Sequence, residues 1–334
     1  MTRPGPIRVA AIEVSHWHSL WDAAYLRLLA AMPDVRLVGL HDPDAAVVER
    51  RAAALGKPPT FTDYRVMLER TTPDFVVALG QHRRMAETAH YLLDHGHAFM
   101  MEKPMGVSAE EVRGIADKAA ARRAFVAVPL PQRYSPFVAR ARRLLADGAF
   151  GPLSHVYLRL NRPTSARYPA WDSPWMLDPA LAGGGCLRNL GAHCFDLFHL
   201  LTGEEARVTA AQLSRRVHGQ AVEDYASVQL RSAGGVLGTV EVGNTVPFDG
   251  SDSEFKLAGR DAILTLYHDD ALRLATARGE ERIDAAPAEP LYLTCVRDIL
   301  EHFRRDAPPP IGVQDCLRVV RLIDEAYRLT EDIP

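Results

Sequence analysis

The stretch Ala98-Phe99-Met100-Met101-Glu102-Lys103-Pro104 joins a short apolar run to a charged pair and a proline. An apolar run of this length, bounded by Gly96 and Pro104, predicts a buried strand of a parallel sheet, with Glu102 and Lys103 at its carboxyl end. Open α/β sheets bind their ligands at that end. Lys103 is one of only four lysines, and a lysine, unlike an arginine, can be tuned to exchange a proton. The stretch therefore predicts a functional lysine, and the alternative is an exposed lysine in a turn.

Strand-like and helix-like segments alternate around this stretch. Apolar runs predict strands at 7–12, 35–40, 75–79, 98–101 and 124–128, and helical spacing of apolar residues predicts helices at 20–31, 45–55, 85–94 and 108–122. The last helix begins at a capping box, Ser108-Ala109-Glu110-Glu111. This order predicts a doubly wound parallel sheet, a Rossmann-type dinucleotide-binding domain over residues 1–128.

The pattern changes after Pro129-Leu130-Pro131. Closely spaced strands are predicted at 153–160, 208–213, 225–230, 236–242, 255–258 and 263–267, with helices at 136–146, 195–201, 291–304 and 313–329. Such spacing favours a large, mostly antiparallel sheet. Residues 129–334 are therefore expected to form an α+β domain for substrate binding and oligomerisation.

Composition excludes several classes of protein. The chain has 334 residues and a formal net charge of -3, and its arginine pairs are scattered, so a nucleic-acid groove is not expected. No apolar run reaches membrane-spanning length, and the N-terminal stretch Met1–Pro6 lacks the apolar core of a signal peptide. The four cysteines show no Cys-x-x-Cys spacing, which is typical of reduced thiols. We expect a cytoplasmic protein without nucleic-acid or membrane partners.

Polar residues follow four of the predicted parallel strands, and strand polarity places them on one edge of the sheet. The candidate cofactor-binding residues are Ser15, His16, Trp17, Asp42, Gly80, Gln81, His82, Glu102 and Lys103. Asp42 carries the most weight, because an acid that ends the second strand accepts the ribose hydroxyls of an adenosine cofactor and repels a 2'-phosphate. It predicts NAD rather than NADP. The alternative is a turn or helix-capping role within Asp42-Pro43-Asp44.

The first strand is not followed by the usual Gly-x-Gly-x-x-Gly. Glu13, Ser15 and His18 stand at the three glycine positions. Either the cofactor is held differently, with Ser15 and a protonated His16 or His18 assisting, or the domain has lost cofactor binding. His16-x-His18 also suggests a metal, with Glu13 and His82 as further ligands, but two histidines are a weak signal and no metal is expected.

A second constellation follows the glycine run Gly183-Gly184-Gly185. Asn189 and His193 are four residues apart, so they share one face if the segment is helical. A histidine there can serve as general base toward a hydroxyl, with Asn189 orienting it or the substrate. The alternative is a buried histidine that bonds to backbone groups.

These residues together resemble the glucose-fructose oxidoreductase, inositol dehydrogenase and MocA (Gfo/Idh/MocA) family over most of the chain. The resemblance rests on an ordered set of motifs: the first strand, Asp42-Pro43-Asp44, Glu102-Lys103-Pro104, Arg133-Tyr134-Ser135-Pro136, the triple glycine with Gly191, His193 and Asp196, Glu223-Asp224-Tyr225, and Leu322-Ile323-Asp324-Glu325-Ala326-Tyr327.

The resemblance implies an NAD(P)-dependent oxidoreductase that acts on a sugar, cyclitol or related polyol. It places Lys103 near the nicotinamide and the reacting hydroxyl, and it maps the family's Asp-x-x-x-His pair onto Asn189 and His193. Asn in place of Asp is a departure, because an amide cannot accept a proton. Pairing of subunits through the open face of the second sheet is also implied, as a homodimer or homotetramer.

The candidate substrate-binding residues are Arg133, Tyr134, Arg162, Trp171, Trp175, Asn189 and His193. Tryptophan rings stack on sugar C–H surfaces and arginines hold anionic groups bidentately. The tryptophans equally suit a contact between subunits. Two further functions stay open: a nicotinamide-assisted elimination, epimerisation or hydrolysis, and a non-catalytic ligand-binding or regulatory protein of the same fold.

Overall fold

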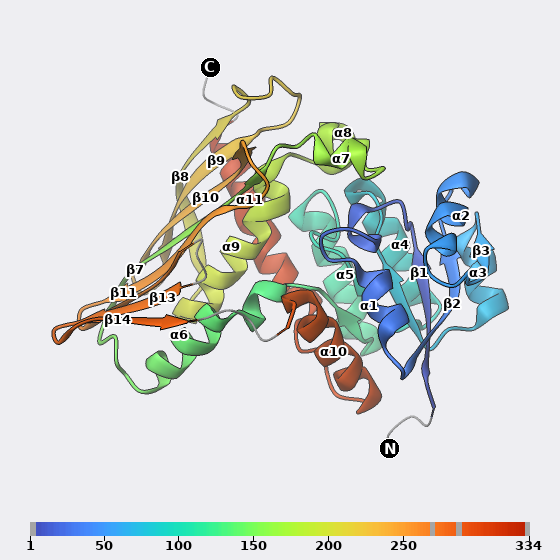
Figure 1. The fold of residues 1–334 in the computed structure, drawn as a ribbon, viewed down its shortest axis with the longest axis horizontal. Coiled ribbons are helices and arrows are strands. Elements are labelled where there is room, and N and C mark those ends of the chain that lie inside the picture. The colour runs from blue at the N-terminus through green and yellow to red at the C-terminus, as the bar shows by residue number, and fades with distance from the viewer. Residues whose placement is uncertain (1–4, 268–270, 285–288, 331–334) are drawn as a thin grey trace. The chain divides into compact units, whose positions relative to one another are not determined.

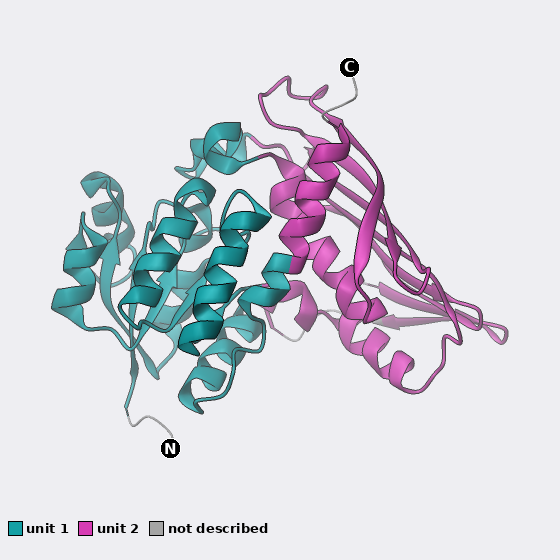
Figure 2. Ribbon diagram, turned by 180° about the vertical axis from the view of Figure 1, so that it is seen from behind, with its two compact units in different colours: residues 1–129, 166–183, 292–317 teal, residues 130–165, 184–291, 318–334 magenta. Residues whose placement is uncertain are grey.

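The computed structural model describes residues 5–267, 271–284 and 289–330, so most of the N-terminal stretch used in the localisation argument, Met1–Pro4, lies outside the described residues. The chain divides into two compact units (Figure 2). Unit 1 comprises residues 1–129, 166–183 and 292–317, and unit 2 comprises residues 130–165, 184–291 and 318–334. Unit 1 therefore includes two segments, 166–183 and 292–317, that the sequence-based expectation assigned to the second domain.

Packing explains why the segment 292–317 belongs to unit 1. Helix α10 (Leu291–Arg304) brings Phe303 against Phe75 and Phe125, with ring centroids 5.0 and 5.6 Å apart. These rings are apolar and Phe303 is buried, so the helix contributes to the core of the parallel sheet. Nothing in the local sequence of α10 specifies this partner.

Unit 1 contains a six-stranded parallel sheet in the order β3-β2-β1-β4-β5-β6. The strands are β1 (Ile7–Ile12), β2 (Val35–His41), β3 (Thr60–Phe61), β4 (Phe75–Ala78), β5 (Phe99–Met101) and β6 (Val126–Ala127). The central strands are buried along their length, as expected for a sheet with helices on both faces (Figure 1). The predicted Rossmann-type fold is confirmed.

The helices of this sheet are α1 (Tyr25–Ala31), α2 (Ala45–Ala53), α3 (Tyr64–Thr71), α4 (His82–Asp94) and α5 (Ala109–Arg122). The predicted cap of α5 is present, since Ser108 accepts a hydrogen bond from Glu111 N at 3.2 Å. The helix predicted at 20–31 is shorter than expected. Asp22 and Ala24 adopt left-handed backbone conformations, which interrupt a right-handed helix, and only a short 3-10 helix η1 (Trp17–Ser19) precedes them.

Unit 2 contains an eight-stranded sheet in the order β14-β13-β12-β11-β7-β10-β9-β8. The strands are β7 (Leu153–Pro163), β8 (Ala206–Ser214), β9 (Tyr225–Ser232), β10 (Leu237–Val246), β11 (Asp252–Gly259), β12 (Ala262–Tyr267), β13 (Ala271–Thr276) and β14 (Gly279–Asp284). Among the described residues, β7 and β10 pair in parallel and the other neighbours are antiparallel. The predicted α+β domain is confirmed, while β13 and β14 were not predicted.

One face of this sheet is covered by helices (Figure 1): α6 (Pro136–Ala146), α9 (Cys186–Thr202) and the later part of α11 (Val313–Thr330). Alternate strand residues such as Val156 and Leu158 pack under them. The intervening residues form a polar layer, in which Tyr157 Oη donates to Glu241 Oε2 at 2.6 Å. No helix within the described ranges is long and apolar enough to span a bilayer.

Candidate active site

The carboxyl ends of β1, β2, β4 and β5 meet at one edge of the parallel sheet in unit 1. Ser15 N, after β1, donates to Asp42 Oδ2 after β2 at 2.7 Å. Gln81 N, after β4, donates to Glu13 Oε2 at 3.1 Å. Parallel strand order thus brings these segments together, as the sequence predicted. Their role in binding a cofactor remains a prediction.

Lys103 lies at this edge, directly after β5, and its side chain is buried with 2% of the residue exposed. The alternative of an exposed lysine in a turn is therefore wrong. Burial lowers the pKa of Lys103, and the charge of Glu102 opposes that effect only in part. A lysine in such a place releases its proton more readily than an exposed lysine does.

Glu102 is held by two side chains from the segment after β1. Its Oε1 atom lies 2.7 Å from His18 Nδ1 and accepts a hydrogen bond from Tyr25 Oη at 2.6 Å. Burial would raise the pKa of Glu102, but the charge and hydrogen bond of His18 lower it overall. Burial would likewise lower the pKa of His18, but Glu102 and Asp22 raise it. The two groups therefore form a buried imidazolium–carboxylate pair next to Lys103.

His16, His18 and Glu102 bring three metal-ligand atoms within 4.8 Å of one another. His16 Nδ1, however, accepts a hydrogen bond from His18 N at 3.1 Å, so in the neutral ring the proton sits on Nε2. Coordination through His16 Nε2 would require the opposite tautomer, and His18 Nδ1 is already engaged with Glu102. These contacts favour proton-carrying side chains over a metal site. Glu13, another ligand considered above, lies instead with Gln81 and Arg84.

The loop after β1 carries larger side chains than a glycine loop, and one of them stands on a backbone conformation that favours glycine. Glu13 has φ 55°, a left-handed conformation normally favoured by glycine. Its buried carboxylate lies 3.3 Å from Arg84 Nη2, and burial raises its pKa more than Arg84 lowers it. Backbone N–H groups of this loop bond to acceptors of the protein itself: those of Glu13, Val14, Ser15, His16 and His18.

Asp42 and Lys103 have the chemistry that the ribose and nicotinamide ends of a dinucleotide require, and both residues are buried, with 1% and 2% exposed. Each oxygen of Asp42 accepts one backbone N–H, from Ser15 at 2.7 Å and from Asp44 at 3.1 Å, and each keeps a lone pair for a ribose hydroxyl. Gly80 has φ 88°, and Lys103 lies two residues beyond Met101, the last residue of β5. The pyrophosphate segment departs from the usual pattern, since α1 begins only at Tyr25. Asp44, not Asp42, caps α2, so the capping alternative for Asp42 is wrong, but the turn alternative is confirmed, because Asp42 Oδ1 accepts from the backbone two residues on.

The aromatic residues of 166–183 pack against the loop after β1. This segment contains three short helices, α7 (Arg167–Ala170), η3 (Pro174–Leu177) and α8 (Pro179–Ala182). Tyr168 and Trp175 contact Trp17, with ring centroids 5.2 and 5.9 Å apart. His82 Nδ1 donates to Ala182 O at 2.8 Å. Residues 166–183 therefore pack against Trp17 and His82, two of the candidate cofactor-binding residues, within unit 1.

The two predicted substrate tryptophans both lie in this segment. Trp175 is 6% exposed and 5.0 Å from the His82 ring, so a role in a contact between subunits does not suit it. Trp171 is partly exposed and lies parallel to Trp21, with centroids 6.3 Å apart and an interplanar angle of 6°. Its exposure leaves a substrate-binding role open.

Asn189 and His193 lie one turn apart on α9 in unit 2, and both are buried. The start of α9 is fixed by Glu223, whose Oε1 accepts hydrogen bonds from Gly185 N at 2.8 Å, Leu187 N at 3.0 Å and Tyr327 Oη at 2.7 Å. A Cβ atom at Gly185 would lie 2.3 Å from Glu223 O, so only glycine fits there. The glycine run thus has a packing role in placing the Asn189–His193 face.

Arg133, which sequence reasoning placed with the substrate, forms two hydrogen bonds with Asp196 of α9. Its Nε lies 2.8 Å from Oδ2 and its Nη2 lies 2.5 Å from Oδ1. This pair anchors the short helix η2 (Pro131–Tyr134), which also contains Tyr134. Arg162 lies in β7. Substrate roles for these three residues remain predictions.

Comparison with known proteins gives the family. Residues 21–129 match the model of the oxidoreductase family with an NAD-binding Rossmann fold, and residues 138–265 match the Gfo/Idh/MocA C-terminal domain. The chain belongs to the Gfo/Idh/MocA family. The resemblance drawn from the motifs is confirmed.

Curated members of the family include a trans-1,2-dihydrobenzene-1,2-diol dehydrogenase of Bos taurus, which is 33% identical over 187 residues, covering 54% of this chain and 53% of that protein. A scyllo-inositol 2-dehydrogenase (NADP+) of Bacillus subtilis (strain 168) is 25% identical over 263 residues, covering 71% of each chain. The match thus spans about half the length of the first of these relatives.

Solved structures share the Gfo/Idh/MocA fold over nearly the whole chain. GenD2 from gentamicin A biosynthesis, in complex with NAD, has a TM-score of 0.84 at 23% identity, covering 98% of this chain and 95% of that one. Levoglucosan dehydrogenase, in complex with NADH and levoglucosan, has a TM-score of 0.83 at 18% identity, covering 98% and 97%. At these identities the likeness shows the fold.

Proposed function

We propose that the protein is an NAD(P)-dependent oxidoreductase acting on a CH–OH group of a sugar, cyclitol or related polyol. The observation that carries this proposal is Lys103, buried at the carboxyl end of β5 with a lowered pKa, in a chain of the Gfo/Idh/MocA family. The named relatives support the substrate class, since they are dehydrogenases of a dihydrodiol and of an inositol.

When bound, the nicotinamide supplies the hydride acceptor at its C4 atom. Lys103 hydrogen-bonds the reacting oxygen and takes its proton, which its lowered pKa allows. The hydrogen bond between His18 and Glu102 holds the Glu102 carboxylate in place beside Lys103. In unit 2, His193 relays this proton onward, and Asn189 orients the histidine or the substrate.

NAD is the preferred cofactor in this proposal. In this proposal the Asp42 carboxylate binds the hydroxyls of the adenosine ribose, and its negative charge repels the 2'-phosphate of NADP. We further propose a homodimer or homotetramer, from the resemblance to the family. The four cysteines are free and buried, which supports the reducing cytoplasm as its compartment.

The test is a screen of sugars, cyclitols and diols with NAD+ and NADP+, followed by absorbance at 340 nm. A substrate that yields one NADH per molecule oxidised supports the proposal. Product formation without a change in NADH would assign the nicotinamide-assisted non-redox reaction instead. A dinucleotide-free protein that binds polyols without turnover would assign the regulatory function, which the internally bonded N–H groups of the β1 loop favour.

A further inference from the structure

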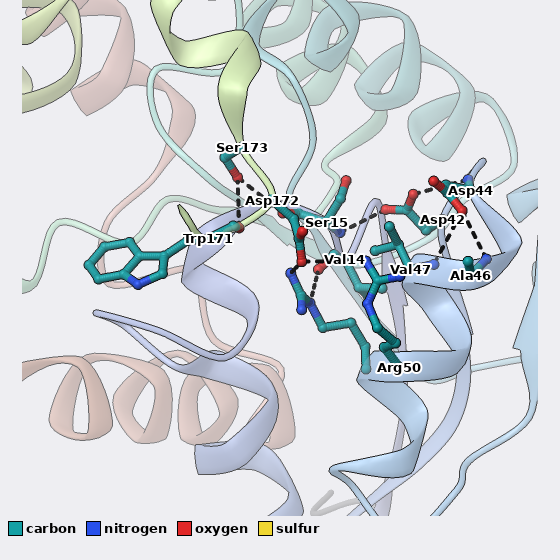
Figure 3. A network of polar contacts seen from close by, with 11 residues as sticks. Val14, Ser15, Asp42, Asp44, Ala46, Val47, Arg50, Trp171, Asp172 and Ser173 are labelled. Atoms are coloured by element: carbon teal, nitrogen blue, oxygen red, sulfur yellow. Dashed lines mark hydrogen bonds and ion pairs between the residues drawn. The ribbon is translucent and has the colours of Figure 1, made fainter. Parts of the chain in front are cut away.

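Three chain segments converge on the two residues Val14 and Ser15, just after β1 (Figure 3). Asp42, at the end of β2, accepts from Ser15 N at 2.7 Å. Arg51 of α2 donates through Nε to Val14 O at 3.1 Å. Ser173 Oγ donates to Ser15 O at 3.0 Å. The ribose-binding carboxylate of the proposed function, an arginine and the segment 171–173 therefore all contact one short piece of backbone.

The Asp172 carboxylate forms ion pairs with two neighbouring guanidinium groups. Its Oδ2 lies 3.1 Å from Arg51 Nη2 and 3.6 Å from Arg50 Nη2. The Arg51 side chain is 4% exposed and lies over the Trp21 ring, 4.3 Å from its centroid, so its direction is fixed. Arg50 is 55% exposed. Without Asp172, the guanidinium groups of Arg50 and Arg51 would be suited to binding a phosphate on a nearby ribose, because guanidinium N–H groups hydrogen-bond well to phosphate oxygens.

We propose that Asp172 determines cofactor choice. It occupies the two guanidinium groups that would hold a 2'-phosphate, and together with Asp42 it makes the ribose end of the site favour NAD over NADP. This inference rests on the proposed function, in that the chain binds a nicotinamide dinucleotide. Asp172 comes from a segment outside the Rossmann order, so no pattern near β2 would reveal it.

The backbone at Asp172 guides the choice of variant. Its φ is 59°, and asparagine tolerates this left-handed conformation as aspartate does. Asp172→Asn therefore removes the charge with little change in shape. Asp178→Asn is a matched control, because Asp178 lies in the same segment and caps α8 by accepting from Ala180 N at 2.9 Å, which asparagine can also do.

The experiment measures the Kd of NADH and NADPH by titration calorimetry, at low ionic strength, for the wild type and both variants. We expect Asp172→Asn to tighten NADPH binding about tenfold, with NADH changed by less than about threefold, as removal of one nearby charge implies. Asp178→Asn should resemble the wild type. Adding Arg50→Ala to Asp172→Asn should reduce the gain, since it removes one of the released guanidinium groups.

Two outcomes would overturn the inference in distinguishable ways. If the NADPH to NADH affinity ratio is the same in the wild type and in Asp172→Asn while NADH binds both, Asp172 has no part in cofactor choice and the proposed function stands. If neither dinucleotide binds either protein, the proposed function fails and the inference fails with it.

Discussion

His18 Nδ1 lies 2.7 Å from Glu102 Oε1 in the interior of unit 1. This contact links the loop after β1 to the segment after β5. The pKa of His18 is raised and the pKa of Glu102 is lowered, so the stability that the pair contributes is lost both at high pH and at low pH. The raised pKa of His18 contributes stability that is complete below its unfolded value near 6.5 and is lost as pH rises through the folded value. The lowered pKa of Glu102 contributes stability that is complete above its unfolded value near 4.5 and is lost as pH falls.

The pair should therefore stabilise the fold most between about pH 4.5 and 6.5. His18→Ala should lower the free energy of unfolding by about 3–5 kcal/mol at pH 6, because it leaves a buried charge with one partner fewer. The loss should be smaller at pH 9, where His18 of the wild type is less protonated. Urea denaturation at both pH values measures this, with the exposed His95→Ala as control. An equal loss at both pH values would show that packing, and not charge, is what the variant removes.

Lys103→Arg should reduce turnover by about 10²- to 10⁴-fold, the usual contribution of a general acid–base group, because arginine keeps the charge but does not release the proton. Alcohol oxidation by the wild type should speed up as pH rises through the lowered pKa of Lys103. Steady-state rates over pH measure both effects. Lys118→Arg, a change in a lysine paired with Asp94 on the surface, should leave the rates unchanged. A near-normal rate in Lys103→Arg would remove Lys103 from catalysis.

The fold could be predicted because its signals are local. Short apolar runs give the strands of the parallel sheet, and Ser108 marks the start of α5 by a side chain three residues from its partner. The predicted start of α1 at Leu20 was wrong, because the apolar spacing that begins there continues through residues whose backbone is left-handed. Strand β14 at the edge of the second sheet and its neighbour β13 were missed.

The candidate site was predictable only in part, for a related reason. Asp42, Gly80 and Lys103 follow strands, and parallel order alone brings such positions together. Tyr25, Asp172 and Ser173 were missed, because each acts on a residue far away in the sequence: Tyr25 on Glu102, and Ser173 on Ser15. No spacing rule describes contacts between segments that meet only after folding.

His193→Ala should cost far more in rate than in stability, and the pH–rate profile should lose an ionisation near neutrality. Asn189→Asp should shift that ionisation upward, because a carboxylate stabilises the imidazolium and an amide does not. Rates over pH, with unfolding midpoints alongside, measure the two effects. His199→Ala, on the same helix, is the control. Unchanged profiles in both variants would make the Asn189–His193 pair structural.

Glu13→Gln should tighten dinucleotide binding, because it removes a negative charge from the loop that faces the pyrophosphate in this fold and keeps an oxygen for Gln81 N. The raised pKa of Glu13 means that the wild type also loses this charge as pH falls, so the difference between the two proteins should shrink at lower pH. Titration of NADH at several pH values tests this. Equal affinity at high pH would show that Glu13 lies away from the pyrophosphate.

The three-part composition of unit 1 has a consequence for synthesis of the protein. A ribosome releases residues 1–129 long before it releases the segment 292–317, yet Phe303 packs on Phe75 and Phe125. Until then the nascent sheet lacks a covering helix, and its apolar side chains stay exposed to water or to chaperones. The N-terminal sheet thus cannot finish folding ahead of the rest of the chain, and its last core contacts are of high contact order.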